Sequence, residues 1–213
     1  MDIAQFKKLP VMGILRGIEA SVVEPLVDVC VSAGLKTIEI TMNTKDAGIL
    51  IKKMKKASGK QLTVGAGTVL NIDDLKKALD CGAEFIVSPV LTDEVIRYCR
   101  EKEIPIFPGA LSPQEICNAW SRGATMVKVF PAKFFGPSYF KEIKGPFADI
   151  ELLACGGVNS ENVRDFFDSG ASAVAFGASI FKPIWLKNKE FGFIAEHLRS
   201  LVEAVKKFKK QIL

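Results

Sequence analysis

A glycine-centred pattern recurs four times along the chain and constrains its fold more than any other feature. In each copy an amphipathic run reaches a glycine, and a β-rich run begins four residues later. The glycines are separated by 48, 41 and 47 residues and are Gly34, Gly82, Gly123 and Gly170. Glycine in this place ends a helix and turns the chain into the next strand.

Four further strand candidates alternate with the strands that follow these glycines. They cover residues 11–15, 62–66, 105–107 and 150–154. Helix starts lie between strands, because Ser112 with Glu115 and Ser21 with Glu24 both have the spacing of a capping box. Eight alternating units in one domain, residues 1–213, predict an α/β fold: a (β/α)8 TIM barrel with a short extra N-terminal helix near residues 2–8. A doubly wound open sheet is the main alternative, and the even spacing favours the barrel.

The composition excludes several classes of protein. With 48% hydrophobic residues, 25% charged residues and a net charge of +5, the chain is typical of a globular protein, and no basic stripe interleaved with aromatics predicts a nucleic-acid partner. Neither a membrane-spanning segment nor a signal-peptide pattern is present, so we expect no membrane partner. The five scattered cysteines and the single histidine, His197, predict a cytoplasmic location and no metal site.

Lys128 is the only charged residue in the apolar run 126–131. A lone buried ammonium is costly, so this lysine must find a partner or lose its proton. A lysine that loses its proton near neutral pH is a nucleophile that forms Schiff bases with ketones. The alternative is a structural lysine that reaches solvent or pairs with a carboxylate.

The repeat places Lys128 opposite an acid. Counting five residues past each repeat glycine gives Glu39, Val87, Lys128 and Ala175, which belong to alternate strands and should share one layer inside the barrel. Two residues further on, the next layer contains Thr41, Pro89, Phe130 and Gly177. We therefore expect a pocket floored by Glu39 and Lys128 at the carboxyl ends of the strands, where such barrels keep their active sites.

Glycine-rich loops after the seventh and eighth strands predict a phosphate site. Gly156 and Gly157 follow one strand, and Gly177 and Ser179 follow the next. Loops at these positions expose backbone N–H groups to anions, although tight turns also need glycine. Arg16 ends the first strand beside the eighth, where it either clamps an anion or forms a surface salt bridge.

Thr68 ends the third strand, within the sequence Gly65-Ala66-Gly67-Thr68-Val69. The small residues let a ligand approach the backbone, and the hydroxyl can bind a carboxylate. A helix cap or a turn would explain the same threonine.

The ordered set of these motifs resembles the 2-keto-3-deoxy-6-phosphogluconate (KDPG) and 4-hydroxy-2-oxoglutarate (KHG) aldolase family, which are class I lyases. The likeness runs along nearly the whole chain. It is carried by Gly13-Ile14-Leu15-Arg16, Ile38-Glu39-Ile40-Thr41, Val64-Gly65-Ala66-Gly67-Thr68-Val69, Phe85-Ile86-Val87-Ser88-Pro89, Pro108-Gly109, Val127-Lys128-Val129-Phe130-Pro131-Ala132, Gly145-Pro146-Phe147 and Gly156-Gly157-Val158.

The resemblance implies an enzyme that needs no metal or other cofactor and cleaves a 2-keto-3-deoxy-6-phospho sugar acid to pyruvate and glyceraldehyde 3-phosphate, or 4-hydroxy-2-oxoglutarate to pyruvate and glyoxylate. It implies a homotrimer and a small-molecule 2-keto acid partner. It assigns the following roles: Lys128 as the Schiff-base lysine, Glu39 as the proton shuttle, Thr68 at the pyruvate carboxylate, Pro89 and Phe130 as pocket walls, Gly156, Gly157 and Ser179 at the phosphate, and Arg16 near the distal end of the substrate.

Two positions depart from the family pattern. Many members carry arginine, which helps to bind the substrate carboxylate, where this chain has Asn43, and many carry threonine where it has Cys155. Both changes leave the substrate open, including the galactonate epimer. A phosphate-binding isomerase or a thiamine-phosphate synthase, a non-catalytic phosphosugar-binding protein and a metal-dependent aldolase are the alternative functions.

Overall fold

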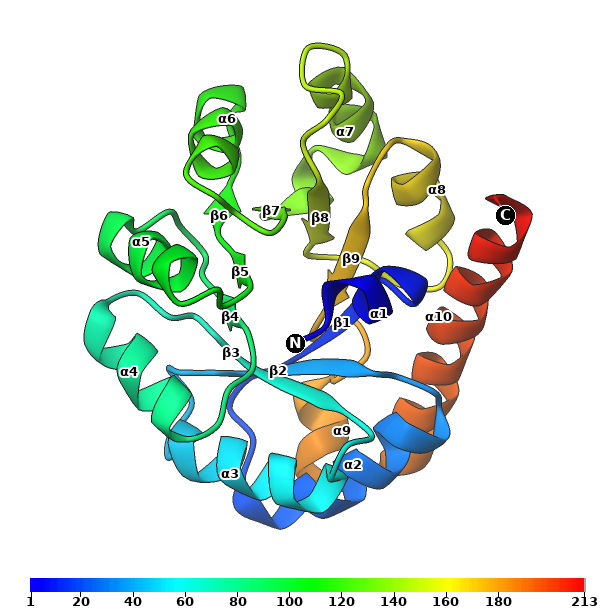
Figure 1. The fold of residues 1–213 in the computed structure, drawn as a ribbon. Helices are drawn as coiled ribbons and strands as arrows, with labels where there is room; N and C mark the ends of the chain where they lie inside the picture. The colour runs from blue at the N-terminus through cyan, green and yellow to red at the C-terminus, as the bar shows by residue number, and fades with distance from the viewer. Residues whose placement is uncertain (213) are drawn as a thin grey trace.

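The computed structural model describes the backbone of residues 1–212 and the side chains of residues 1–210. Its strands form one parallel sheet with the order β5-β4-β3-β2-β1-β9-β8-β7-β6, ringed by helices (Figure 1). The strands are β1 (Val11–Leu15), β2 (Thr37–Thr41), β3 (Thr63–Gly67), β4 (Ile86–Val87), β5 (Ile106–Phe107), β6 (Gly109–Ala110), β7 (Val127–Val129), β8 (Leu152–Cys155) and β9 (Ala173–Phe176). The predicted TIM barrel is confirmed.

The predicted count of eight strands needs one correction, because the expected fifth strand is two short strands, β5 and β6. They are separated by Pro108, which has no N–H to donate to a ladder. The N–H of Thr125 donates to the Ile106 carbonyl at 2.9 Å, and the N–H of Lys128 donates to the Pro108 carbonyl at 2.8 Å. The first bond joins the residue two before β7 to β5, the second joins β7 to the break, and β7 pairs in parallel with β6, so the sheet closes on itself.

The helices alternate with the strands as the repeat predicts. They are α1 (Ile3–Lys8), α2 (Val23–Ser32), α3 (Ala47–Ser58), α4 (Ile72–Asp80), α5 (Asp93–Glu101), α6 (Pro113–Ser121), α7 (Gly136–Lys144), α8 (Val163–Asp168), α9 (Pro183–Lys187) and α10 (Phe191–Ile212), with 3-10 turns η1 (Ala20–Val22) and η2 (Ala132–Phe134). All four repeat glycines have φ between +83° and +98° just after a helix, which is the left-handed conformation expected of helix ends.

The two predicted capping boxes have different outcomes. The Ser112–Glu115 box is formed at the start of α6. The Ser21–Glu24 box is wrong: Ser21 lies inside η1, Val22 precedes the first residue of α2, and Glu24 pairs instead with Lys53 at 3.5 Å. A 3-10 turn leading directly into α2 takes Ser21 out of the extended conformation that a capping residue needs.

Two apolar cores hold the barrel together. The larger lies between the sheet and its helices, and the smaller fills the barrel interior. α1 covers the amino end of the barrel (Figure 1), where Phe6 packs edge-to-face on Phe107 with ring centroids 5.9 Å apart, and Phe107 packs on Phe85 in the same way. Phe6 is only 3% exposed, so this helix is a plug for that end of the barrel.

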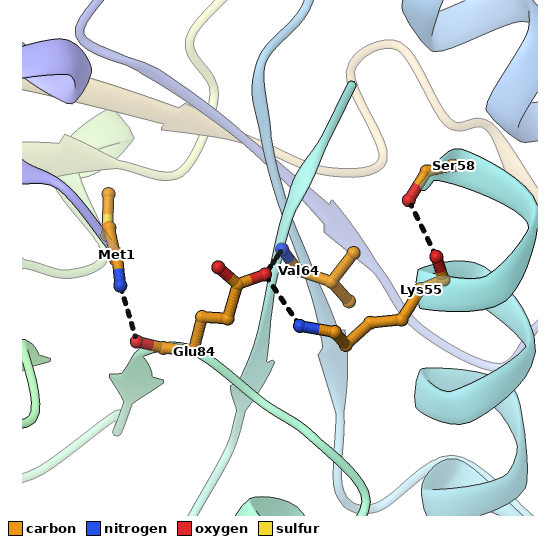
Figure 2. A network of polar contacts seen from close by, with 5 residues as sticks. All are labelled: Met1, Lys55, Ser58, Val64 and Glu84. Carbon is orange, nitrogen blue, oxygen red and sulfur yellow. Dashed lines mark hydrogen bonds and ion pairs between the residues drawn. The ribbon is translucent and has the colours of Figure 1, made fainter. Parts of the chain in front are cut away.

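The polar groups beside the plug are paired with one another (Figure 2). The Glu84 carboxylate accepts hydrogen bonds from Lys55 Nζ at 2.9 Å and from the Val64 N–H at 3.3 Å. The Glu84 carbonyl accepts one from the Met1 amino group at 3.3 Å. The amino end of the barrel is thus closed by α1 and tied to β3 and α3.

None of the helices in residues 1–212 combines the length and the hydropathy of a membrane span.

Candidate active site

Lys128 is presented by β7 with its side chain inside the barrel. The flanking Val127 and Val129 belong to the outer core, so the alternation of the strand turns Lys128 inward. The residue is 6% exposed, and its Nζ lies 5.5 Å from the centre of the Phe130 ring. Among the described residues it forms no ion pair. Lys128 therefore has the burial expected of an imine-forming lysine and lacks the carboxylate partner of a structural one.

Glu39 projects from β2 into the same interior layer. It is 1% exposed, and the other two predicted members of the layer, Val87 and Ala175, are buried in the interior core. Burial raises the pKa of Glu39 above its usual range, and the charges of Lys128 and Arg16 oppose that rise. The charge of Lys128 thus acts on Glu39, although the two side chains form no ion pair.

The position of the Glu39 carboxyl group depends on Gly67 of β3. A Cβ at Gly67 would lie 2.3 Å from Oε1 of Glu39, so only glycine leaves room for the carboxyl group. The other oxygen, Oε2, is buried and has no hydrogen-bond partner among the described residues. Unpaired buried carboxyl oxygens are rare and costly, which makes this one a candidate for proton transfer to a ligand.

Cys155 of β8 is part of this cluster. It is 3% exposed within the interior core. Burial raises the pKa of its thiol, and the charge of the nearby Lys128 opposes that rise. The sequence marks Cys155 as a departure from the family pattern, and the structure shows that this departure lies directly beside the lysine.

Arg16 and Thr68 are brought together across the mouth of the barrel. Arg16 Nη2 donates to Thr68 Oγ1 at 3.4 Å, and Thr68 has φ of +56°, a left-handed conformation that is rare for threonine. The predicted pocket residue Thr41 lies near them, and sequence reasoning missed its partner, Thr44. Thr41 Oγ1 and Thr44 Oγ1 are 3.0 Å apart, and the Gly17 N–H donates to Thr44 Oγ1 at 3.0 Å. Only the position of Thr44 near predicted site residues could have indicated it.

The predicted walls, Pro89 and Phe130, line one cavity of about 370 Å³ together with Gly109 and Ala110. A Cβ at Gly109 would lie 2.0 Å from the Pro89 carbonyl oxygen, so glycine there lets the loop carrying Pro89 approach β6. Phe130 is 40% exposed, because it stands at the rim of the barrel. The structure therefore places Phe130 beside Lys128, and Pro89 in a cavity that neither Lys128 nor Glu39 lines.

The glycine-rich loops follow β8 and β9 as predicted. Gly157 has φ of +81°, and a Cβ there would lie 2.7 Å from Lys133 Cβ. The Ser179 hydroxyl donates to the Val158 carbonyl at 2.7 Å, which ties the loops together. Gly156 and Gly177 are half-buried beside them. The backbone N–H groups of Gly157, Ala178 and Ser179 donate to no group within the described chain, so they can receive an anion.

Residues 1–212 contain no group of three or more His, Cys, Asp or Glu side chains placed to hold a metal ion.

The fold and the site together define a class of proteins: β/α barrels with a buried amine, a buried carboxyl oxygen that has no partner among the described residues, and glycine-rich loops with free N–H groups at the carboxyl ends of their strands. A model of the family described as "KDPG and KHG aldolase" matches residues 3–197. The chain is 37% identical over 159 residues to a 2-dehydro-3-deoxy-phosphogluconate aldolase of Pseudomonas aeruginosa, covering 74% of this chain and 70% of that protein.

It is 32% identical over 176 residues to 2-dehydro-3-deoxy-6-phosphogalactonate aldolase of Escherichia coli (strain K12), covering 82% of this chain and 86% of that protein. A solved KDPG aldolase from Legionella pneumophila, with pyruvate captured as a covalent carbinolamine intermediate, superposes with a TM-score of 0.85 and 26% identity over 93% of this chain and 96% of that one. The chain belongs to the KDPG and KHG aldolase family. It is thus a carbon–carbon lyase of the aldolase type.

Proposed function

We propose that the protein is a class I aldolase that cleaves a 2-keto-3-deoxy-6-phospho sugar acid into pyruvate and glyceraldehyde 3-phosphate, with Lys128 as its Schiff-base lysine. The observation that carries this proposal is the buried, unpaired Lys128 in one layer with Glu39, whose Oε2 has no partner among the described residues. The relatives that act on phosphogluconate and phosphogalactonate derivatives support the substrate class.

The chemistry begins when the neutral amine of Lys128 attacks the C2 ketone carbon of the substrate. Glu39 supplies a proton as the carbinolamine loses water, which leaves a protonated imine that withdraws electrons. The C3–C4 bond then breaks as the C4 hydroxyl gives its proton to the Glu39 carboxylate. An aldehyde leaves and an enamine remains. Protonation of the enamine at C3 and hydrolysis of the imine release pyruvate and restore the free lysine.

The surroundings supply binding and protection for these steps. Pro89 and Phe130 cover the pyruvyl group, and the Thr68 hydroxyl meets its carboxylate. The free N–H groups of Gly157 and Ser179 donate hydrogen bonds to the negatively charged phosphate oxygens. The Ser179 hydroxyl already donates a hydrogen bond to the Val158 carbonyl, so Ser179 contributes to phosphate binding through its backbone N–H.

The decisive experiment is reductive trapping. Incubation with pyruvate and borohydride should attach a carboxyethyl group to one lysine, and peptide mapping should locate it at Lys128. The Lys128→Ala variant should take up no label and lose more than about 10³-fold in aldol cleavage, because the covalent route is removed. Lys76→Ala, at an exposed position on α4, is the matched control. Label on another lysine, or near-normal cleavage by Lys128→Ala, would refute the proposal.

We also propose that catalysis is independent of metal, which persistence of activity in EDTA would support. The alternative of a phosphate-binding isomerase or synthase predicts that pyruvate and borohydride leave the protein unmodified. A non-catalytic binding protein predicts ligand binding without imine formation or turnover.

Three further features belong to the proposal: a single barrel domain, a reducing cytoplasmic location and a homotrimer. The five cysteines are free, which supports a reducing compartment. Exposed apolar side chains gather in the loops at the carboxyl end of the barrel, and a trimer interface would cover them; they include Val90, Phe134 and Phe135. Light scattering should give three times the chain mass of 23.2 kDa, and a monomer would contradict the trimer.

A further inference from the structure

We propose that Lys133, which lies beside the glycine-rich loop after β8, binds the phosphate group of the substrate and gives the enzyme a preference for phosphorylated 2-keto acids. This inference rests on the proposed function and names a binding residue that neither the sequence motifs nor the family resemblance singles out. The backbone N–H groups of the loops can donate hydrogen bonds to an anion but carry no full charge, and Lys133 supplies one.

The first observation is that the stem of Lys133 packs on the loop. Lys133 lies in the 3-10 turn η2, which follows β7, and Gly157 follows the neighbouring strand β8. A Cβ at Gly157 would lie 2.7 Å from Cβ and 3.8 Å from Cδ of Lys133, so the lysine side chain runs along the loop. Because Nζ is only two bonds beyond Cδ, the ammonium group is within reach of an anion that the loop holds.

The second observation is that the ammonium group is available. Lys133 is exposed and forms no ion pair with any acid in the described part of the chain. Its Nζ lies 4.9 Å from the centre of the Phe134 ring, which is itself 73% exposed. An exposed cation–π contact contributes only about 0.5–1 kcal/mol. A phosphate group, with a charge of about −1.5 to −2 at neutral pH, is the stronger partner for Lys133.

The third observation is that two other basic side chains at this end of the barrel are directed elsewhere. Lys182 comes shortly after the loop that follows β9, but its Nζ lies 4.1 Å from the centre of the Trp185 ring. Arg16 reaches across the mouth, where its Nη2 donates to Thr68 at the end of β3. Lys133 is therefore better placed than either of them to meet an anion at the loop after β8.

The fourth observation is that this loop is held in a fixed shape. Asn162 donates from Nδ2 to the Gly157 carbonyl at 2.9 Å, and the Ser179 hydroxyl donates to the Val158 carbonyl at 2.7 Å. The N–H groups of Gly157 and Ser179 donate to no group within the described chain. A phosphate that accepts from these N–H groups lies beside the Lys133 stem, so the neutral donors and the charged one meet the same anion.

The test removes the charge and keeps the stem. Lys133→Met retains the packing on the loop and should weaken the binding of inorganic phosphate, measured by phosphorus NMR titration, by about 10-fold, the lower end of the range for a charge-assisted hydrogen bond. The KM of a 2-keto-3-deoxy-6-phospho sugar acid should rise by a similar factor. The kcat and the KM of the non-phosphorylated analogue should stay within about twofold of the wild type, because only binding of the phosphate is affected.

Two further variants separate charge from packing. Lys133→Arg keeps the positive charge and should bind phosphate within about threefold of the wild type. Lys141→Met, at an exposed position on α7, makes the same change of net charge away from the loop and is the matched control. The difference between Lys133→Met and the wild type should shrink as salt is added, because an exposed charge is screened. A difference that salt leaves unchanged would overturn the electrostatic role.

The contrary outcomes are distinct. Unchanged phosphate binding in Lys133→Met would overturn the inference, while the proposed function would stand. An equal loss for the phosphorylated and the non-phosphorylated substrate would also overturn it, because it would place Lys133 away from the phosphate. A wild-type protein that pyruvate and borohydride leave unlabelled would overturn the proposed function and, with it, the preference among 2-keto acids.

Discussion

The two ends of this barrel use their polar groups in opposite ways. At the amino end, beneath α1, the Glu84 carboxylate is paired with Lys55 and with the Val64 N–H (Figure 2), and the rings of Phe6 and Phe107 pack edge-to-face. At the carboxyl end, Glu39 has an unpaired buried oxygen and Lys128 has no ion pair among the described residues. The same scaffold therefore gains stability at one end and carries costly, reactive groups at the other.

This comparison teaches that unpaired groups indicate function better than charge alone does. The Lys55–Glu84 pair is a structural ion pair like many on protein surfaces, with each side chain about one-third exposed. Lys128 and Glu39 have the same chemistry but are more deeply buried and do not pair, although they share a layer. Changes at the two ends should therefore affect different properties: activity at the carboxyl end and stability at the amino end.

The largest effect should follow from Glu39→Gln. This nearly isosteric change removes the proton relay, so aldol cleavage should fall by about 10²–10⁴-fold. The measurement is kcat with a phosphorylated substrate, and Glu203→Gln on the exposed side of α10 serves as the control. Cleavage within tenfold of the wild-type rate would show that another group moves the proton.

Phe6→Ala should show the opposite behaviour at the amino end. Loss of a ring that is 3% exposed should reduce the free energy of unfolding by about 3–5 kcal/mol, because a cavity replaces the plug. Urea unfolding measures this loss, while kcat per folded molecule should stay at the wild-type level. The exposed Phe193→Ala is the matched control. A large fall in kcat would mean that the two ends are coupled.

The pH dependence of stability should reveal the cost of the buried Glu39. Because its folded pKa is raised above the unfolded value near 4.5, the contribution of Glu39 to stability is most favourable below that value and is lost as pH rises through the folded pKa. Glu39→Gln removes this loss, so at pH 8 its Tm should exceed that of the wild type by about 2–4 °C. The difference should shrink below pH 4.5; a variant less stable than the wild type at pH 8 would contradict a costly carboxylate.

The smallest effect should come from Glu84→Gln. The Lys55–Glu84 pair is about one-third exposed on each side, so its loss should cost no more than about 1 kcal/mol, and less in high salt. Chemical unfolding at low and high ionic strength measures it. A cost that salt does not reduce would indicate that the hydrogen bond to the Val64 N–H matters more than the charge.

Much of the fold could be predicted because its signals are local. The repeat glycines end helices through their own backbone freedom, and β1 was predicted with its bounds intact. The predictions were wrong where the surrounding structure determines the local conformation. Pro108 divides one predicted strand into β5 and β6, and Ser21, a predicted helix cap, lies in a 3-10 turn. The shared layer of Glu39 and Lys128 could be predicted because, in a regular repeat, the spacing along the sequence gives the position of each residue in the barrel.

The sequence by itself thus determined the barrel, the inward lysine and acid, and the glycine-rich loops, since each depends on periodicity or backbone freedom within a few residues. Only the tertiary structure decided which groups pair. Arg16 meets Thr68 across 52 residues, and Gly67 makes room for the Glu39 carboxyl group. Such contacts depend on distances of a few ångströms between separate strands, which periodicity cannot specify. Whether a buried charge is satisfied or left free to react is therefore a property of the folded molecule.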